Sequence, residues 1–411
     1  MSPVASHDSN AMTDPEPQHD GLDLNAVCDL FESSTDFTVG IEEEFAILDP
    51  AILDLEHRFE EMYAACLRDE LLAPSVRGEL IDTEIEIRSG RGETFSDAAD
   101  RQRIRRERLF GIADELGLAL AATGTHPWAN YLDQHIINTE HYRRLERDLR
   151  WVAQRNNTWS LHVHVGVRGA DRAVAVSDRM RELLPLLLAL SANSPFLDHR
   201  DTGLHSVRTE IFTRVFPRCG IHEPFGDWVT YSDFVRLLRD TGSIAEATEI
   251  WWSVRPHHLF GTVEVRICDA QTRGDESLNL AALITACVAQ TAIDVDEGRS
   301  HGSSGFHGRL GVGQREIEEN LWRAIRHGMD GEMIDFRDRR LVPTRAVLED
   351  LVEWTEPARG TLGVDVDLPE QNGAQRAYAR FAEGAPIEEI YRRAVEETRK
   401  TYAPEGAVSG R

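Results

Sequence analysis

Lysine is almost absent from this chain of 411 residues: of its 45 basic residues only Lys400 is a lysine, and the others are arginine. A phosphate-binding loop of the G-x-x-x-x-G-K-[ST] type requires a lysine inside the loop, so this chain has no such loop. We attribute the bias to genome composition, but it has a chemical consequence. If the protein handles phosphate groups, arginine side chains and metal ions must bind them.

Cysteine and long apolar runs are also scarce. The five cysteines form no C-x-x-C pair, which argues against a zinc ribbon and against a disulfide framework. The N-terminus lacks the basic start and apolar core of a signal peptide. The longest apolar stretch, around Leu183–Ala192, is interrupted by Pro185 and is too short to span a bilayer. We therefore expect a soluble, cytoplasmic protein.

Positive charge is in deficit, with 45 basic against 71 acidic residues and a net charge of −26. Nucleic acid and anionic membrane would repel such a chain, so we expect neither as a partner and expect small molecules instead. The hydrophobic content of 41% is ample for a buried core. The sequence leaves the oligomeric state open, a homo-oligomer included.

Composition divides the chain into one large ordered unit with weak ends. Residues 1–36 read as a poorly ordered tail with a short helix near 24–31, and 403–411 as a frayed end. Residues 37–402 are expected to form a single catalytic domain, interrupted by a flexible loop at about 298–313. Apolar spacings of three and four predict helices at 96–116, 172–190, 231–241, 279–296, 314–327, 344–355 and 386–401.

Four segments instead alternate apolar and polar residues with the period of a strand, at 39–48, 80–88, 160–167 and 261–268. No β-α-β rhythm links them, so we expect an α+β protein with a largely antiparallel sheet. Only Glu43 interrupts an apolar face. The opposite faces carry, in chain order, Glu42 and Glu44; Asp82, Glu84 and Glu86; His162 and His164; and Glu264 and Arg266.

These polar faces are unusual because they hold almost only acidic, imidazole and arginine groups. Solvated strand faces normally include Thr and other uncharged residues. In one sheet the carboxylates would repel each other unless cations lay among them, and Arg266 and divalent metal are the candidates. Carboxylates with one or two imidazoles and no thiolates suit Mg²⁺ or Mn²⁺ better than zinc. We expect helices to cover one face of the sheet and an acidic, metal-binding trough to line the other.

In chain order, several phrases resemble the carboxylate–amine ligase family, also called glutamate–cysteine ligase type 2. They run from residue 38 to residue 335: TVGIEEEF, ELIDTEIEI, TGTHPWA, SLHVHVGV, LSANSPFLDHRDTGLHSVR, FPRCG, WWSVRPH, GTVEVRICDAQT and NLWRAIRHGMDGEMID. The resemblance implies a fold like those of glutamine synthetase and the guanidino kinases. In that fold an antiparallel sheet curves into a funnel that nucleotide and substrate enter from opposite ends.

The resemblance also implies a reaction and its residues. ATP would phosphorylate the glutamate γ-carboxylate, and the amine of cysteine would then displace phosphate to form an amide. Metal ligation falls on Glu42, Glu44, Glu86, Glu264 and His162. Nucleotide contacts fall on His162 and His164, and Arg266 would stabilise the transferring phosphoryl group. Arg266, Glu264 and Glu86 are thus the expected catalytic residues.

Residues expected at the substrates are less clearly marked. Arg208 is expected to hold a substrate carboxylate or phosphate, with a surface salt bridge as the alternative. Trp251 and Trp252 are expected to wall the amine pocket unless they are core residues, and Arg255 lies close to the same mouth. Glu84 stands where the family more often has glutamine. This departure, with others just after the S-P-F segment at 194–196, concerns the identities of the acid and the amine and does not affect the expected reaction type.

Four other functions compete with this prediction. A related ligase would join another amino acid and amine. A guanidino kinase would transfer phosphate and stop there, and would need a reactive cysteine facing its substrate. A metal-dependent hydrolase would use His162 and His164. A non-catalytic binding protein would require the acidic faces to be incidental.

Overall fold

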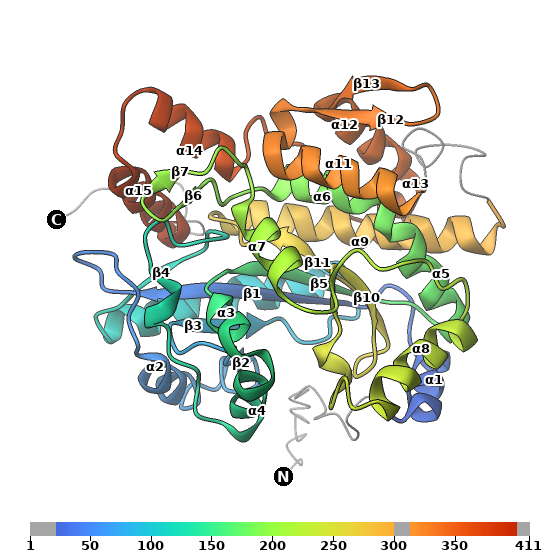
Figure 1. The fold of residues 1–411 in the computed structure, drawn as a ribbon, viewed down its shortest axis with the longest axis horizontal. Coiled ribbons are helices and arrows are strands. Elements are labelled where there is room, and N and C mark those ends of the chain that lie inside the picture. The colour runs from blue at the N-terminus through green and yellow to red at the C-terminus, as the bar shows by residue number, and fades with distance from the viewer. Residues whose placement is uncertain (1–21, 300–312, 401–411) are drawn as a thin grey trace, which may run out of the picture.

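A computed structural model describes residues 22–299 and 313–400 of the chain (Figure 1). Its centre is a seven-stranded sheet in the order β10-β11-β5-β1-β3-β2, with β4 paired to β1, and every pairing is antiparallel. The strands are β1 (Val39–Leu48), β2 (Val76–Arg77), β3 (Glu84–Arg88), β4 (Ala119–Ala121), β5 (Ser160–Gly166), β10 (Val254–His257) and β11 (Thr262–Asp269). The predicted α+β class with an antiparallel sheet is confirmed.

One of the four predicted strands is shorter than expected. The segment 80–88 is a strand only from Glu84, because Asp82 and Thr83 form a turn and Ile81 makes an isolated bridge with Ile136. Asp82 therefore leaves the acidic face on which the alternation placed it. The turn nevertheless stays close to the sheet, because the backbone N–H of Ile47 donates to the Thr83 carbonyl at 2.9 Å.

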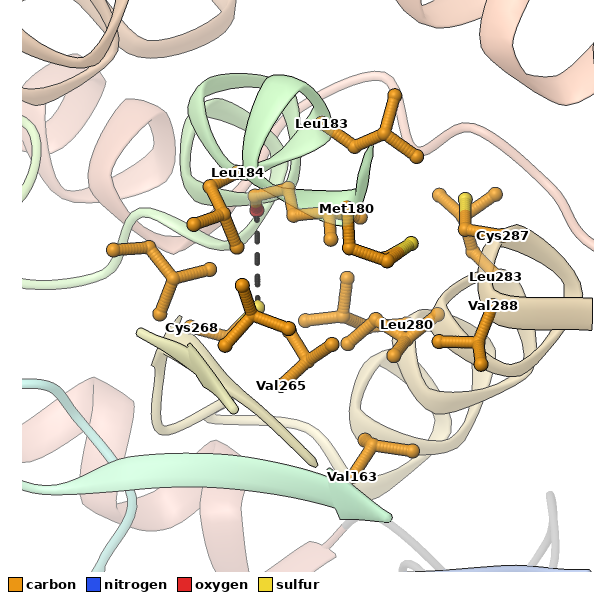
Figure 2. Packing of buried hydrophobic residues seen from close by; sticks show 14 of the residues in the cluster. Val163, Met180, Leu183, Leu184, Val265, Cys268, Leu280, Leu283, Cys287 and Val288 are labelled. Atoms are coloured by element: carbon orange, nitrogen blue, oxygen red, sulfur yellow. Dashed lines mark hydrogen bonds between the residues drawn. The ribbon is translucent and has the colours of Figure 1, made fainter. Parts of the chain in front are cut away.

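Helices cover the apolar face of the sheet (Figure 1): α6 (Leu184–Ser191) and α9 (Gly274–Asp296) lie against its strands, and α11 (Gln314–His327) packs on α6. The predicted helix 172–190 is divided into α5 (Ala170–Met180) and α6, because Pro185 lacks an N–H and lies in the first turn of α6. Figure 2 shows side chains of these helices and of β5 and β11 pointing toward one another, among them Val163, Met180, Leu184, Val265, Leu280 and Cys287.

Helix α9 is long and apolar enough to cross a membrane by length and composition alone. However, 83% of its most apolar stretch is buried inside the protein. Its apolar residues contact the sheet and the neighbouring helices, as expected for a helix that is hydrophobic on all sides and lies in a core.

A second apolar cluster lies under the β1–β3 half of the sheet, against α2 (Phe59–Cys66) and α3 (Phe95–Glu115). Here Glu43, the residue that interrupts the apolar face of β1, forms a buried ion pair with Arg106 of α3. Gln102 donates to the same carboxylate at 2.9 Å and Ser277 at 2.8 Å. Glu43 is thus a structural residue, and these partners offset the cost of burying its charge.

The remaining helices and strands surround the central sheet and the helices that cover its apolar face. They are the helices α1 (Leu24–Glu32), α4 (Glu140–Leu149), α7 (Val207–Val215), α8 (Trp228–Asp240), α12 (Thr344–Trp354), α13 (Glu356–Leu362), α14 (Gly373–Ala382) and α15 (Ile387–Lys400), and three two-stranded sheets, β6 (Phe196–Leu197) with β7 (Arg200–Asp201), β8 (Cys219–Gly220) with β9 (Trp251–Trp252), and β12 (Glu332–Asp335) with β13 (Arg340–Pro343).

The expected N-terminal tail requires a correction from residue 22 onward. The short helix predicted near 24–31 is present as α1, capped by Asp23, but it is not part of a poorly ordered segment. Val27 and Phe31 are fully buried in the main core, because α1 packs against α5. Residues 1–21, most of the loop predicted at 298–313, and the predicted frayed end lie outside the described residues.

A buried histidine makes stability depend on pH. His126 accepts backbone N–H groups of Trp128 (3.3 Å) and Ala129 (3.0 Å) through Nδ1, and its Nε2–H donates to the Leu53 carbonyl at 2.7 Å. Burial lowers the pKa of His126 to about 4. Because the folded pKa lies below the unfolded value of about 6.5, only the unfolded chain binds a proton in between, so stability falls as pH drops through this window.

We expect His126 to account for about 2.5 kcal/mol of lost unfolding free energy between pH 7 and pH 4.5. Denaturant unfolding at both pH values should therefore show a smaller acid-induced loss in His126→Gln than in the wild type, even though the variant starts less stable. An equal loss in the two proteins would contradict this prediction.

Candidate active site

Strand register brings the predicted polar residues onto one face. In the β-ladder Glu42 lies opposite His162 on one side and Arg88 on the other. In the same ladder Glu44 lies opposite Glu86, and Glu264 lies opposite His164. The expected acidic trough is therefore present, and it is a cavity of about 300 Å³ open at the surface.

The centre of this cavity is a cluster of buried ligand groups. Oxygen atoms of Glu42 and Glu264 and a ring nitrogen of His162 all lie within 4.8 Å of one another. Nδ1 of His162 is 3.3 Å from Glu42, and its Nε2 is 2.8 Å from the Ser160 hydroxyl. Carboxylate oxygens with one imidazole and no thiolate are a donor set that fits Mg²⁺ or Mn²⁺.

Two arginines neutralise Glu264 from opposite sides. Nε of Arg255 donates to one oxygen at 2.6 Å, and Nη1 of Arg266 pairs with the other. Burial alone would raise the pKa of Glu264, but the charges of Arg255 and Arg266 hold it well below its usual range. The charge of Arg88 does the same for Glu42, again against the effect of burial. These two carboxylates are therefore charged.

Burial, together with the nearby charge of Arg266, lowers the pKa of His162 to about 4. The imidazole is thus neutral at pH 7 and able to act as a ligand. The buried Nε of Arg266 has no hydrogen-bond partner within the described residues, so it can still donate to a bound ligand.

The other half of the cavity holds carboxylates with too few cations. Burial, followed by the charge of Glu44, raises the pKa of Glu84 well above its usual range. Burial and the neighbouring Glu86 do the same for Glu79. Glu84 is only 1% exposed, and within the described part of the chain its Oε2 has no hydrogen-bond partner. This half of the cavity is built to receive a positive group.

Arg208 also lines this cavity. It belongs to α7 and is buried, with Nη1 donating to the Ile267 carbonyl at 3.0 Å and Nη2 to that of Arg266 at 3.3 Å. Nη1 also lies 3.5 Å from Asp269. Arg208 is therefore not in a surface salt bridge, and its guanidinium is held in a fixed position at the cavity wall.

Most of the predicted site residues line this cavity: Glu42, Glu44, Glu84, Glu86, His162, Arg208, Trp251, Arg255, Glu264 and Arg266. His164 shares their sheet face but lines a second cavity of about 190 Å³. The two cavities have Glu42, Arg88, Leu259 and Phe260 in common, so they meet along one wall.

Trp252 is the exception and lies in an aromatic core. Successive strand residues face opposite ways, so when Trp251 faces the cavity its neighbour cannot. Trp252 is 7% exposed and stacks on Phe234 with ring centroids 6.0 Å apart. The expectation that both tryptophans wall the amine pocket is thus corrected for Trp252.

Several cavity residues were not predicted from the sequence, namely Glu79, Arg88, Glu246 and Glu249. Arg88 could have been found, because it follows Glu84 and Glu86 at the same spacing of two on one strand face. The others lie outside the main sheet, where the strand period gives no information.

A family model described as glutamate-cysteine ligase family 2 matches residues 38–372, which is most of the chain. The chain belongs to this family. A similar protein of Solibacter usitatus (strain Ellin6076) is 34% identical over 385 residues, covering 91% of this chain and 96% of that protein. One of Sorangium cellulosum (strain So ce56) is 38% identical over 337 residues, covering 81% and 86%. Both carry the name glutamate–cysteine ligase 2 as a provisional assignment.

Solved structures of low sequence identity share the fold. A glutamate–cysteine ligase of Francisella tularensis in complex with AMP has a TM-score of 0.62 at 12% identity, with 91% of each chain covered. A bifunctional glutathione synthetase from Pasteurella multocida has a TM-score of 0.63 at 11% identity, covering 93% of this chain and 54% of that one. This member of the glutamate–cysteine ligase family is an ATP-dependent carboxylate–amine ligase.

Proposed function

We propose that this ligase joins the γ-carboxylate of glutamate to the amine of cysteine through an acyl phosphate, with Mg²⁺ or Mn²⁺ as the metal. The carboxylate oxygen takes the γ-phosphoryl group of ATP and ADP leaves. The amine nitrogen then attacks the carbonyl carbon, the bond to phosphate breaks, and the nitrogen loses a proton. The observation that carries this proposal is the pairing, in one cavity, of a metal-suited cluster with an acidic half that accepts a cation.

On the phosphate side, Glu42, Glu44, Glu86, Glu264 and His162 would hold the metal ions, which neutralise phosphate charge in such reactions. Arg266 lies beside Glu264 and its Nε is free of hydrogen bonds among the described residues, so it can donate to the transferring phosphoryl group. Arg208 is held at the cavity wall, where its charge acts on Glu44 and Glu84.

The second cavity suits the nucleotide base. Its lining combines apolar side chains, such as Leu30 and Phe260, with the backbone of Gly40 and with His164. Because this cavity meets the first along a shared wall, a nucleotide bound there would place its phosphates toward Glu42 and Glu264. Nucleotide and amino acid would then enter from different ends.

On the substrate side, Glu84 and Glu79 would receive the ammonium group of an amino acid. The Oε2 atom of Glu84 provides a charge-assisted acceptor that no described residue uses. Trp251 lies at the same cavity and would contact the less polar part of the substrate. Arg255, by contrast, donates through Nε to Glu264 and through Nη1 to two carbonyl groups, so we assign it the role of positioning Glu264.

The competing functions fit the site less well. A guanidino kinase would need a reactive cysteine, but none of the five cysteines lines the cavity. The nearby Cys219 has its pKa raised by burial to about 12, so it stays a thiol. A hydrolase that used both strand histidines would need them on one metal. Nε2 of His164 lies 3.4 Å from Glu42 and 3.7 Å from Glu264, but among the described residues no group of ligand atoms within 4.8 Å of one another includes both histidines.

One assay tests the proposal. The protein is incubated with ATP, Mg²⁺, hydroxylamine and each of a panel of amino acids, while ADP, phosphate and hydroxamate are measured. We expect glutamate to stimulate ATP turnover and to yield its hydroxamate in step with phosphate release. No stimulation by any acid would overturn the ligase mechanism. Phosphate transfer to a guanidino compound without hydroxamate would overturn it in favour of a kinase.

A further inference from the structure

Outside the cavity, three metal-ligand side chains converge at the surface. They are His57, Asp82 and His135, whose ligand atoms all lie within 4.8 Å of one another. Nδ1 of His57 is 2.5 Å from one oxygen of Asp82, and Nδ1 of His135 is 3.6 Å from the other. The two imidazole rings stack with centroids 4.2 Å apart. Both rings thus present the same nitrogen to one carboxylate.

Backbone hydrogen bonds hold the three segments together. The N–H of Asp82 donates to the carbonyl of His135 at 3.0 Å, and the Asp82 carbonyl accepts from the N–H of Phe59, two residues after His57, at 3.1 Å. Below them, the buried Thr83 hydroxyl donates to Gln134 at 2.7 Å. The ligands therefore stand on a fixed base, which lowers the conformational cost of closing around an ion.

We propose that His57, Asp82 and His135 form a binding site for a divalent transition ion of the zinc class, separate from the magnesium-type cluster of the cavity. Two imidazoles and one carboxylate are ligands that Zn²⁺ takes in sites whose fourth position is left to water. The exposed fraction of the side chains, 34% for His57 and 69% for His135, lets an ion reach them, and the contact between His57 and Asp82 would open as the ion enters. This proposal does not depend on which substrates the ligase uses.

Its place in the chain gives the site a consequence. Asp82 belongs to the turn between Glu79 and Glu84, and both of these glutamates line the ligase cavity. An ion bound by Asp82 would tie this turn to the segments that carry His57 and His135. Zinc would thereby restrict the movement of the two carboxylates that face the substrate side.

Equilibrium dialysis with Zn²⁺ in excess Mg²⁺ tests the site on the full chain. We expect Asp82→Asn and His135→Ala each to bind one zinc ion fewer than the wild type, or to bind it more than about 10-fold more weakly, since even the loss of a second-shell partner costs that much. The exposed His327 provides the matched control, and His327→Ala should bind as the wild type does. Equal zinc stoichiometry and affinity in all four proteins would overturn the proposal.

Cobalt distinguishes this site from the cavity. Co²⁺ bound by His57, Asp82 and His135 should give a visible absorption band that His135→Ala loses and His162→Gln keeps. A band that disappears in His162→Gln and persists in His135→Ala would place the ion in the cavity and overturn the assignment.

Hydrogen exchange tests the effect on the turn. Zinc should slow amide exchange over residues 78–84 several-fold in the wild type and not in Asp82→Asn. Unchanged exchange in the wild type at saturating zinc would overturn the role of the ion as a restraint on the turn.

Discussion

Replacing Glu264 with glutamine is expected to lower ATP turnover by on the order of 10³-fold, because it removes a charged ligand from the metal-suited cluster. Glutamine keeps an oxygen that can accept from Nε of Arg255 at a site that is 1% exposed. The loss of charge still leaves two buried arginines poorly neutralised, which should cost about 3 kcal/mol of stability while the protein remains folded. Turnover assays and denaturant unfolding on the same preparation measure both effects.

Glu43 provides the matched control. Glu43→Gln also removes a buried carboxylate that pairs with an arginine, but on the packed face of β1. We expect a comparable loss of stability with turnover of the folded protein retained. Retained turnover in Glu264→Gln, or an equal loss of turnover in Glu43→Gln, would contradict the role assigned to the cavity face.

Replacing Glu84 with glutamine is expected to act in the opposite direction on stability. Burial and its acidic neighbours already raise the pKa of Glu84, so an uncharged side chain of the same shape relieves a repulsion and should raise the free energy of unfolding. Binding should suffer instead. Loss of a charge-assisted hydrogen bond to an ammonium group should raise the KM of the amino acid about 10- to 100-fold.

With hydroxylamine in place of the natural amine, the KM of the acid substrate can be measured by itself. With the acid substrate saturating, the KM of the natural amine can be measured in turn. Glu246→Gln is the control, since Glu246 lines the same cavity but is paired with Arg144 and partly exposed; its KM should change by less than about fivefold. If Glu84→Gln leaves the KM of both substrates unchanged, the acidic half of the cavity does not bind an ammonium group.

The alternation of side chains along a strand allowed the sequence to predict which residues share a strand face. It placed Glu42, Glu44, Glu86 and Glu264 on strand faces, and those faces met in one cavity because the alternation holds around these four residues. The alternation fails elsewhere, before Glu84 and at the register shift of β11 between Val265 and Cys268. It could not say which strands are neighbours or in what register, since pairing is set by long-range packing.

The remaining differences have local causes. Residues 22–36 are polar on average, but the apolar positions of α1 lie on one side and are buried, so composition alone underestimated their order. Asp82 followed the alternation in sequence while its backbone turned away from the strand. Glu79 and Glu246 reach the cavity from segments without periodicity, and only the three-dimensional structure brings them there.

The register of the central sheet also implies that the reaction and the substrate preference change at different rates during evolution. A slip of one residue between β1 and β5 would turn Glu42 and Glu44 into the packed core and Glu43 into the cavity, so the positions of the phosphate-side carboxylates are fixed by the same register that packs the core. Glu79 and Trp251 also line the cavity, but they stand outside the central sheet, so its ladder does not constrain them. A chain built this way can acquire a new amino acid or amine by substitution at those positions while its strands stay the same. Substrate preference should therefore diverge among relatives of this ligase faster than the reaction that they catalyse.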